Sequence, residues 1–228
     1  MNVGEPLLFL FAFGFGLGAV VDTVGGVPYL SFILPGMVAN AVFFTASFET
    51  SIGAFSRFHV QKTYNAILAT PVSLAEIVWG EIVWASTKGM LAALMVYFVG
   101  VAVGALPSMA DGIIGWLWLL PFAPCFAASG MLCTAYAKSY NSFSYFFTLW
   151  VTPSLLFGGV FFEISRFPEW VQGLSWLLPM THAVALVRHV MLGSEMSFAL
   201  LGHAGYILLL GILLIYLAQR KLHKRLFD

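Results

Sequence analysis

Long apolar runs with almost no charge are the feature that most constrains this sequence. Only 9% of its 228 residues are charged, whereas a soluble domain carries roughly 25%, so there are too few charges to cover a surface in water. In lipid, every backbone polar group must be satisfied internally, which leaves α-helices or closed β-barrels. The runs do not alternate between apolar and polar residues as barrel strands do. The sequence therefore predicts an all-α integral membrane protein.

Six of the apolar runs are predicted to cross the membrane, and together they make up one transmembrane domain over residues 1–228. A crossing helix needs roughly 20 mainly apolar residues. We place the spans at about residues 7–21, 29–48, 77–106, 113–137, 143–162 and 203–217. Pro121 and Pro124 lie inside the fourth span, and proline removes a helical hydrogen bond, so we expect a kink there.

The segment 163–202 is apolar but is interrupted repeatedly, at Pro168, Gly173, Pro179 and Gly193. No uninterrupted piece of it is long enough to cross a bilayer. Irregular backbone at membrane depth is tolerated only where protein or a water-filled cavity surrounds it. We therefore expect outer re-entrant helices between spans five and six.

Positive residues gather on one side of this six-span chain. Arg57, Lys62, Lys138 and the basic tail at residues 220–225 fall on the same side, and the short turns opposite them contain no Lys or Arg. Cytoplasmic loops carry an excess of these residues. The pattern predicts that both termini are cytoplasmic.

No motif in the sequence points to catalysis or to a bound cofactor. There is no phosphate-binding loop, no H-E-x-x-H and no Cys or His pair at the spacing of a zinc site. Cys125 and Cys133 share one predicted helix and are expected to be packing residues. The net charge is zero, so nothing points to nucleic acid as a partner. We expect no catalytic, cofactor-binding or metal-binding residue here, and an energy source outside this chain.

Two glycines of the first span, Gly14 and Gly18, have the G-x-x-x-G spacing. Small residues at this spacing let a second helix approach closely in lipid. The pattern indicates either packing within the chain or the seam of a homodimer.

Two ionisable residues, Glu81 and Lys88, lie inside the predicted third span. They are seven residues apart and therefore share a helix face. An ionisable residue at this depth usually faces a partner or an aqueous cavity. One hypothesis places Glu81 at the inner interface and lets Lys88 snorkel or pair inside the bundle. The other gives both residues a direct role in the transport path.

Aromatic residues form 16% of the sequence, and most of them fit interfacial belts or core packing. Aromatic rings also offer stacking surfaces to an amphiphilic substrate. The residues placed deepest, or nearest the outer mouth, are a possible substrate path: Phe43, Phe44, Tyr145, Phe157 and Phe161.

The inner loop RFHVQKTYNAILAT, residues 57–70, is predicted to form a short amphipathic helix. Its apolar face carries Val60, Tyr64, Ile67 and Leu68, with Lys62 elsewhere. Such a face binds either the membrane surface or a partner protein. The two flanking spans hold this helix rigidly, which favours a docking element with Tyr64 as its aromatic anchor.

This loop lies within a stretch, residues 48–89, that resembles type-2 ABC exporter permeases, and among them the NodJ-like branch of nodulation-factor exporters. The resemblance extends nearly end to end and in order. It includes GFGLG at residues 14–18, TPSLLFGGVFF at 152–162 and FPEWVQGLSWLLPMTHAVALVRHVMLG at 167–193.

The resemblance implies a six-helix permease of the bacterial inner membrane that works as a homodimer with two ATP-binding subunits. Those subunits would hold the ATP and Mg²⁺. It also implies a coupling helix at residues 57–70, comprising Arg57, Val60, Lys62, Tyr64, Ile67 and Leu68. Substrates of this branch are lipo-oligosaccharides and related amphiphiles, exported from the cytoplasmic side.

The sequence departs from the family pattern at two places. Family members begin with an amphipathic cytoplasmic helix, whereas this sequence begins almost inside the first span, as a truncated or mis-assigned start would. Glu163 follows the FF pair where the family often has Pro.

The sequence also allows two functions other than the export of a lipid-linked glycan. One is the export of drugs or small lipids by a permease of the same architecture. The other is an intramembrane lipid-modifying enzyme, and the missing catalytic set counts against it.

Overall fold

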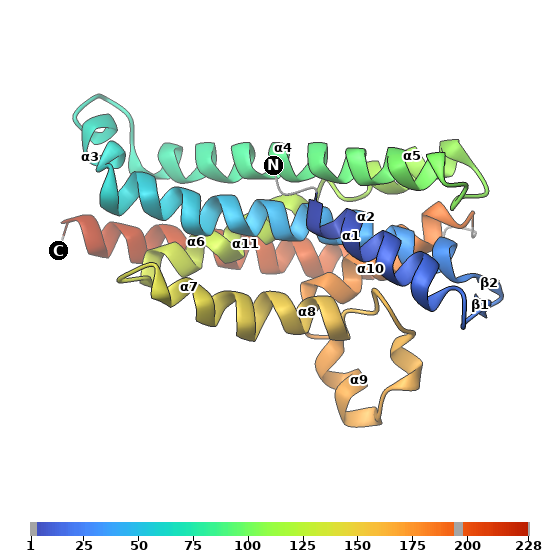
Figure 1. Cartoon of the computed structure of the whole chain (residues 1–228). Helices are drawn as coiled ribbons and strands as arrows, with labels where there is room; N and C mark the ends of the chain where they lie inside the picture. The colour runs from blue at the N-terminus through green and yellow to red at the C-terminus, as the bar shows by residue number, and fades with distance from the viewer. Residues whose placement is uncertain (1–3, 194–197, 228) are drawn as a thin grey trace.

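The chain folds into an elongated bundle whose helices run roughly along one long axis (Figure 1). This computed structural model describes residues 4–193 and 198–227. At one end of the bundle lie helix α3 (Thr63–Leu68) and the C-terminal end of α11 (Phe198–Phe227), and we call it the α3 end. At the other end lies a small antiparallel hairpin of β1 (Thr23–Val24) and β2 (Val27–Pro28), and we call it the hairpin end.

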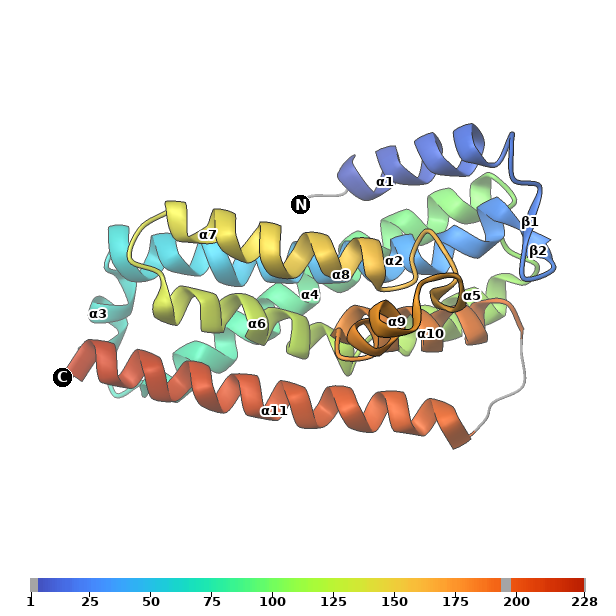
Figure 2. The ribbon, with the colours of Figure 1, turned by 90° about the horizontal axis from the view of Figure 1, so that it is seen from below.

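The remaining helices fill the length between these two ends. They are α1 (Gly4–Phe11), α2 (Tyr29–Phe48), α4 (Leu74–Ala102), α5 (Met109–Leu117), α6 (Phe122–Tyr136), α7 (Asn141–Phe146), α8 (Thr152–Phe157), α9 (Glu169–Ser175) and α10 (Pro179–Met191). Wider π turns extend α1 through Leu17, extend α2 through Glu49–Gly53 and Ser56–Val60, and join α7 to α8. Figure 2 shows α11 along one long side of the bundle and α1 on the opposite side.

Among the described residues, three helices are long and apolar enough to cross a membrane: Tyr29–Val60, Leu74–Ala102 and Leu201–Leu226. The pair α5 and α6 makes a fourth if it is counted as one span, with a bend of 43° between the two helices. The bend lies beside Pro121, as expected from the loss of a helical hydrogen bond. The helical segment Gly4–Leu17 is apolar but shorter. The helical membrane fold is thus supported, and six crossings remain a prediction.

Several helix ends differ from the predicted span limits. The helix from Tyr29 does not end at residue 48 but continues through Glu49 to Val60, because no glycine pair or proline interrupts it there. The fifth predicted span ends early, at Phe157, where Gly158 and Gly159 follow.

Helix α11 is longer than the span predicted at residues 203–217, since the basic tail continues it to Phe227. Helix α4 begins slightly earlier than residue 77, at Leu74. A capping box fixes this start, because the Glu76 carboxylate accepts from the Ser73 backbone N–H (2.7 Å) and the Ser73 hydroxyl accepts from the Glu76 N–H.

The interrupted segment after residue 163 folds as short helices, as its breakers indicate. Pro168 precedes α9, Pro179 begins α10, and Gly193 ends α10 with a positive φ of 72°. Gly173 does not interrupt the chain, since it lies inside α9. In Figure 1, α9 projects sideways from the bundle.

Arg188 of α10 holds the irregular segment that follows α8 against α2. Its guanidinium donates to the carbonyl oxygens of Phe32 (3.0 Å) and Gly159 (2.7 Å) and lies 3.8 Å from the centre of the Phe32 ring. The Tyr29 hydroxyl donates to the Phe161 carbonyl oxygen (3.3 Å). The bonds to Gly159 and Phe161 satisfy backbone groups beyond the end of α8, which a membrane interior requires.

Hydrogen bonds from side-chain hydroxyls link the α2 run to α6, and a glycine of α6 lets the two helices approach closely. The Thr50 hydroxyl donates to the Ala127 carbonyl oxygen (2.6 Å), and the Ser47 hydroxyl donates to that of Phe126 (3.2 Å). Gly130 leaves room for this approach, since a Cβ there would overlap the Thr50 side chain and the Ser47 carbonyl. Small residues and such bonds are what associates helices in lipid.

The first glycine of the G-x-x-x-G pattern packs within the chain. A Cβ on Gly14 would overlap Leu30 of α2, whereas one on Gly16 would meet no atom within 4 Å. Leu30 belongs to this same chain, so packing within the chain accounts for Gly14. Phe11 and Phe15 stack on the outward face of this segment, with ring centres 5.9 Å apart.

Replacing Gly130 by Ala tests the α2–α6 contact. The added methyl forces the helices apart, and overpacking costs about 1–3 kcal/mol, so we expect Gly130→Ala to lower the midpoint of thermal unfolding in detergent. Gly205→Ala is the matched control, because nothing lies within 4 Å of a Cβ there and Ala is the better helix former. Equal midpoints for the two variants would contradict this packing.

Candidate coupling site

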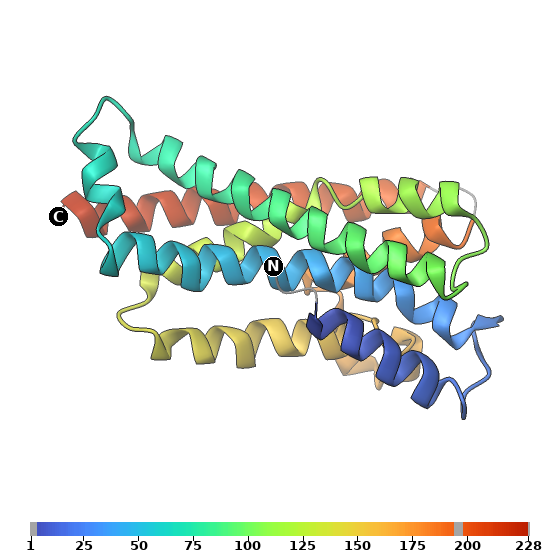
Figure 3. The same ribbon diagram turned by 45° about the horizontal axis from the view of Figure 1, so that its top comes forward.

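The loop at the α3 end is not the single helix predicted for residues 57–70. Its first part, Ser56–Val60, is the last π turn of the α2 run, and α3 begins only at Thr63. Between them the chain reverses at Lys62, whose φ of 52° lies in the left-handed region. Figure 3 shows this loop standing out beyond the helices at the α3 end.

Tyr64 was predicted to be an exposed anchor, and that prediction is wrong. Its side chain is only 1% exposed, and its ring packs against Phe58 at 5.6 Å between centres. The turn at Lys62 rotates α3, so that Tyr64 points into the bundle. Burial, together with the nearby Glu81 carboxylate, raises the pKa of Tyr64 above its ordinary value, so the phenol stays neutral.

Other residues of the loop form its outer surface. Val60 is 58% exposed, and Lys62, Asn65 and Ala66 are also exposed. Ile67 and Leu68 are half-buried and pack against the core. The outer surface of the loop is therefore small and mixed in polarity, and we call these four exposed residues the α3 face.

Arg57 is the centre of a network of four charged side chains. Its Nε donates to Glu81 Oε1 (2.7 Å), and its Nη2 contacts both Glu81 Oε2 and Glu49 Oε1, the latter at 3.1 Å. Lys88 Nζ donates to the other oxygen of Glu49 (2.9 Å) and lies 4.8 Å from the centre of the Trp84 ring. The network therefore ties the end of the α2 run to two turns of α4.

The four charges balance, and each carboxylate is well shielded. The side chains of Glu81 and Glu49 are 10% and 15% exposed, and those of Arg57 and Lys88 are 29% and 30% exposed. Charge-assisted bonds of this kind, one of them bidentate, are among the stronger polar contacts in proteins. Removing one member leaves a poorly solvated charge without its partner, which is costly.

The π turns around Gly53 fit the backbone to this network. A Cβ on Gly53 would lie only 3.3 Å from Glu49 Oε1 and 3.5 Å from Arg57 Nη2, so a larger residue would crowd the ion pair. The Thr134 hydroxyl of α6 lies 2.8 Å from the carbonyl oxygens of both Thr50 and Ser51. It satisfies backbone groups in the π turn, a distortion that is frequent at functional sites.

Glu81 and Lys88 each pair with a residue of the α2 run. Lys88 pairs inside the bundle, as one hypothesis held, and the two residues share a face without pairing with each other. Glu49, which connects them through Arg57, was missed by the sequence analysis. Its position in the sequence could have indicated the pairing, because Glu49 lies eight residues before Arg57, about two helical turns away on the same face.

A groove of about 420 Å³ separates α3 from the first turns of α4. Arg57, Tyr64, Ile67, Glu81 and Trp84 are among the residues that line it. The charged network therefore forms one wall of the space behind α3.

The aromatic residues suggested as a substrate path do not form one surface. Phe43 is fully buried against Phe126, and Phe161 is buried against Phe13. Enclosed rings of this kind have no free face for a substrate in this conformation.

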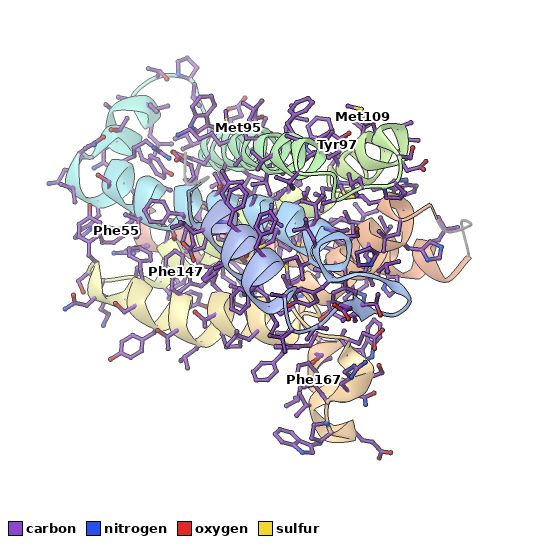
Figure 4. The ribbon with its side chains drawn as sticks, turned by 45° about the vertical axis from the view of Figure 1, so that its right-hand side comes forward. Phe55, Met95, Tyr97, Met109, Phe147 and Phe167 are labelled. Carbon is purple, nitrogen blue, oxygen red and sulfur yellow. The ribbon has the colours of Figure 1, made fainter. Side chains whose placement is uncertain are left out.

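The other three aromatic residues lie apart from one another. Phe44 is half-buried against Phe147, and Phe157 contacts Phe167, which Figure 4 shows in the segment that carries α9. Tyr145 is 70% exposed and lines a groove beside α7. Of the five, Tyr145 has the most accessible ring.

The charged side chains at this site neutralise one another. Within residues 4–193 and 198–227, no three His, Cys, Asp or Glu side chains gather as metal ligands would. All four charged groups at the site are bound to one another. The cluster therefore joins the end of the α2 run to α4.

Comparison with known proteins shows the family to which the chain belongs. The model of the family described as ABC-2 type transporter matches residues 1–192. Nodulation protein J of Sinorhizobium fredii is 36% identical, over 100% of this chain and 86% of its own length. Nodulation protein J of Rhizobium leguminosarum bv. trifolii is 37% identical, over 99% and 85%.

A more distant relative has a broader name. The inner membrane transport permease YadH of Escherichia coli is 27% identical, over 82% of this chain and 72% of its own length. The long apolar helices, the family match over most of the chain and the NodJ-like relatives agree with one another. The chain therefore belongs to the ABC-2 type transporter family, as a permease similar to nodulation protein J.

Proposed function

We propose that this chain is the permease subunit of an exporter that moves an amphiphilic substrate out of the cytoplasm. The substrate class is a lipo-oligosaccharide or another lipid-linked glycan, because relatives covering nearly the whole chain are named nodulation proteins. The energy comes from ATP hydrolysed by a partner subunit, with which the family works. The observation that carries the proposal is the ionic attachment of the end of the α2 run, directly before α3, to α4.

The proposed assembly has two copies of this chain and two ATP-binding subunits in the bacterial inner membrane. Six crossings place both termini in the cytoplasm, with α9 and α10 on the outer side. The basic residues of α11 and the α3 loop support this orientation, since they lie at the same end of the bundle and cytoplasmic segments favour Lys and Arg.

In this proposal the α3 face docks against the partner subunit. Because Arg57 bonds to both Glu49 and Glu81, movement of the loop displaces the ends of α2 and α4 together. Glu81 and Lys88 then transmit the motion and do not contact the substrate.

A second candidate is an exporter of drugs or small lipids with the same architecture. It is favoured by the similarity to a relative whose name specifies only a transport permease. The two candidates share the coupling site and differ in the substrate.

Reconstitution tests the function directly. Proteoliposomes that contain this chain and its ATP-binding partner are expected to move a labelled lipo-oligosaccharide across the bilayer only when ATP is present. Export of small lipophilic dyes without export of the glycan would favour the second candidate. Movement without the partner subunit would contradict both.

Substitutions on the loop separate docking from folding. Val60→Asp puts a charge on the exposed α3 face, and we expect about a tenfold weaker pull-down of the partner subunit with unchanged thermal stability. Tyr64→Ala removes a buried aromatic side chain, so it should lower stability by about 3 kcal/mol or more. If Val60→Asp bound the partner normally, the α3 face would not be the docking surface.

Breaking the charged network should uncouple the two subunits. Arg57→Ala leaves two shielded carboxylates without their shared partner, and hydrogen bonds to charged groups contribute about 1.5–3 kcal/mol each. We expect export to fall at least tenfold while the partner subunit still binds. The measurements are ATP hydrolysis and substrate export in the same proteoliposomes.

The matched control is Arg166→Ala. It breaks the exposed ion pair with Glu163 (3.3 Å), and exposed pairs contribute about 0–1 kcal/mol, so export should be unaffected. Equal export by both variants would show that the network is dispensable for coupling.

A further inference from the structure

A second groove, of about 540 Å³, opens between α6, α7 and α11 towards the α3 end. Its walls are mainly apolar and aromatic, and include Leu132, Tyr136, Tyr145, Leu149, Trp150 and Leu214. This volume is within the range of small-molecule sites in proteins. The groove is distinct from the coupling site, with which it shares no residue.

The groove exists because α7 packs on the rest of the bundle along one edge only. Phe143 of α7 and Phe55 at the end of the α2 run form a small cluster with Ala137, and Phe147 packs against it. Figure 4 shows Phe55 and Phe147 at this end of the molecule. Beyond that cluster the side chains of Tyr145 and Leu149 are each 70% exposed.

Positive side chains border the groove near the α3 end. Lys221 of α11 lies with its Nζ 4.7 Å from the centre of the Tyr136 ring, which is part of the groove wall. Lys138 directly follows Ala137, another wall residue, and is exposed. Arg225 Nη1 donates to the Ala137 carbonyl oxygen (2.6 Å) and adds a third positive charge.

None of these three cations forms an ion pair with a carboxylate of the described residues. The carboxylates of Glu49 and Glu81 form their ion pairs with Arg57 and Lys88 instead. An apolar groove therefore opens beside three positive side chains that pair with no carboxylate in residues 4–193 and 198–227.

We propose that this groove binds an anionic phospholipid of the inner leaflet. One acyl chain lies along the aromatic wall, and the phosphate contacts Lys221 and Lys138. Basic pockets between transmembrane helices on the cytoplasmic side are suited to anionic headgroups, and hydrogen bonds from an ammonium to a phosphate are charge-assisted. A bound acyl chain fills the gap between α7 and its neighbours.

Charge argues against a second copy of this chain as the occupant. In a two-fold contact the same patch meets itself, so the cations of the two copies would be brought together without a carboxylate between them. An anionic lipid neutralises the same charges, and the inner leaflet supplies it in excess.

Native mass spectrometry of the purified full-length chain tests this site. The probes are dioleoyl phosphatidylglycerol and dioleoyl phosphatidylcholine, titrated separately, and the readout is the affinity for the first bound lipid. We expect the anionic lipid to bind about thirtyfold more tightly, as two surface cations imply. The double substitution Lys138→Ala and Lys221→Ala should remove this preference.

Two matched controls make the test specific. Arg220→Ala removes a neighbouring cation of α11 that lines a different groove, and the preference should persist. Leu214→Trp fills the groove and should weaken binding of both lipids, whereas Leu213→Trp, on the exposed surface of the same helix, should not.

Three lipid-binding results would overturn the proposal. They are the absence of a headgroup preference, a preference that survives loss of both lysines, and equal lipid binding by Leu214→Trp and Leu213→Trp. Efficient disulfide cross-linking between two copies of a Tyr145→Cys variant would also overturn it, because a second chain would then cover the groove. None of these results depends on which substrate the protein exports.

Discussion

The bidentate contact of Arg57 with Glu81, extended through Glu49 to Lys88, is the interaction on which the α3 end of the molecule depends. It pairs two positive with two negative side chains at the edge of an apolar bundle. Because these residues come from the α2 run and from α4, the network joins the two helices that flank α3. The buried Tyr64 and the reversal at Lys62 attach α3 to the same unit.

The rest of the bundle meets a single requirement of the membrane, that every backbone polar group has a partner. At the α3 end, Thr134 satisfies carbonyls of the π turn that carries Glu49. At the hairpin end, Arg188 and Tyr29 satisfy those left free where α8 ends. The two irregular regions are therefore held by side chains from neighbouring helices, and both join α2 to a later part of the chain.

Composition and helix breakers predicted much of this fold. Apolar runs indicated the helices, Pro121 indicated the bend, and Gly193 indicated the end of α10, since each acts locally. The coupling site was harder to predict, because its geometry depends on two non-local features. The left-handed turn falls on a lysine, a residue that rarely adopts it, and the partner of Lys88 is Glu49, which is distant in sequence.

We propose that the α3 loop and the start of α4 move as one unit when ATP binds to the partner subunit. Spin labels at Ala69, beside α3, and at Trp79, in α4, would report their separation by pulsed electron paramagnetic resonance in the assembled transporter. We predict the same distance distribution in the nucleotide-free and ATP-bound states of the wild type, and a broadened one in Arg57→Ala. A distance that changed with nucleotide in the wild type would show that the loop moves independently of α4.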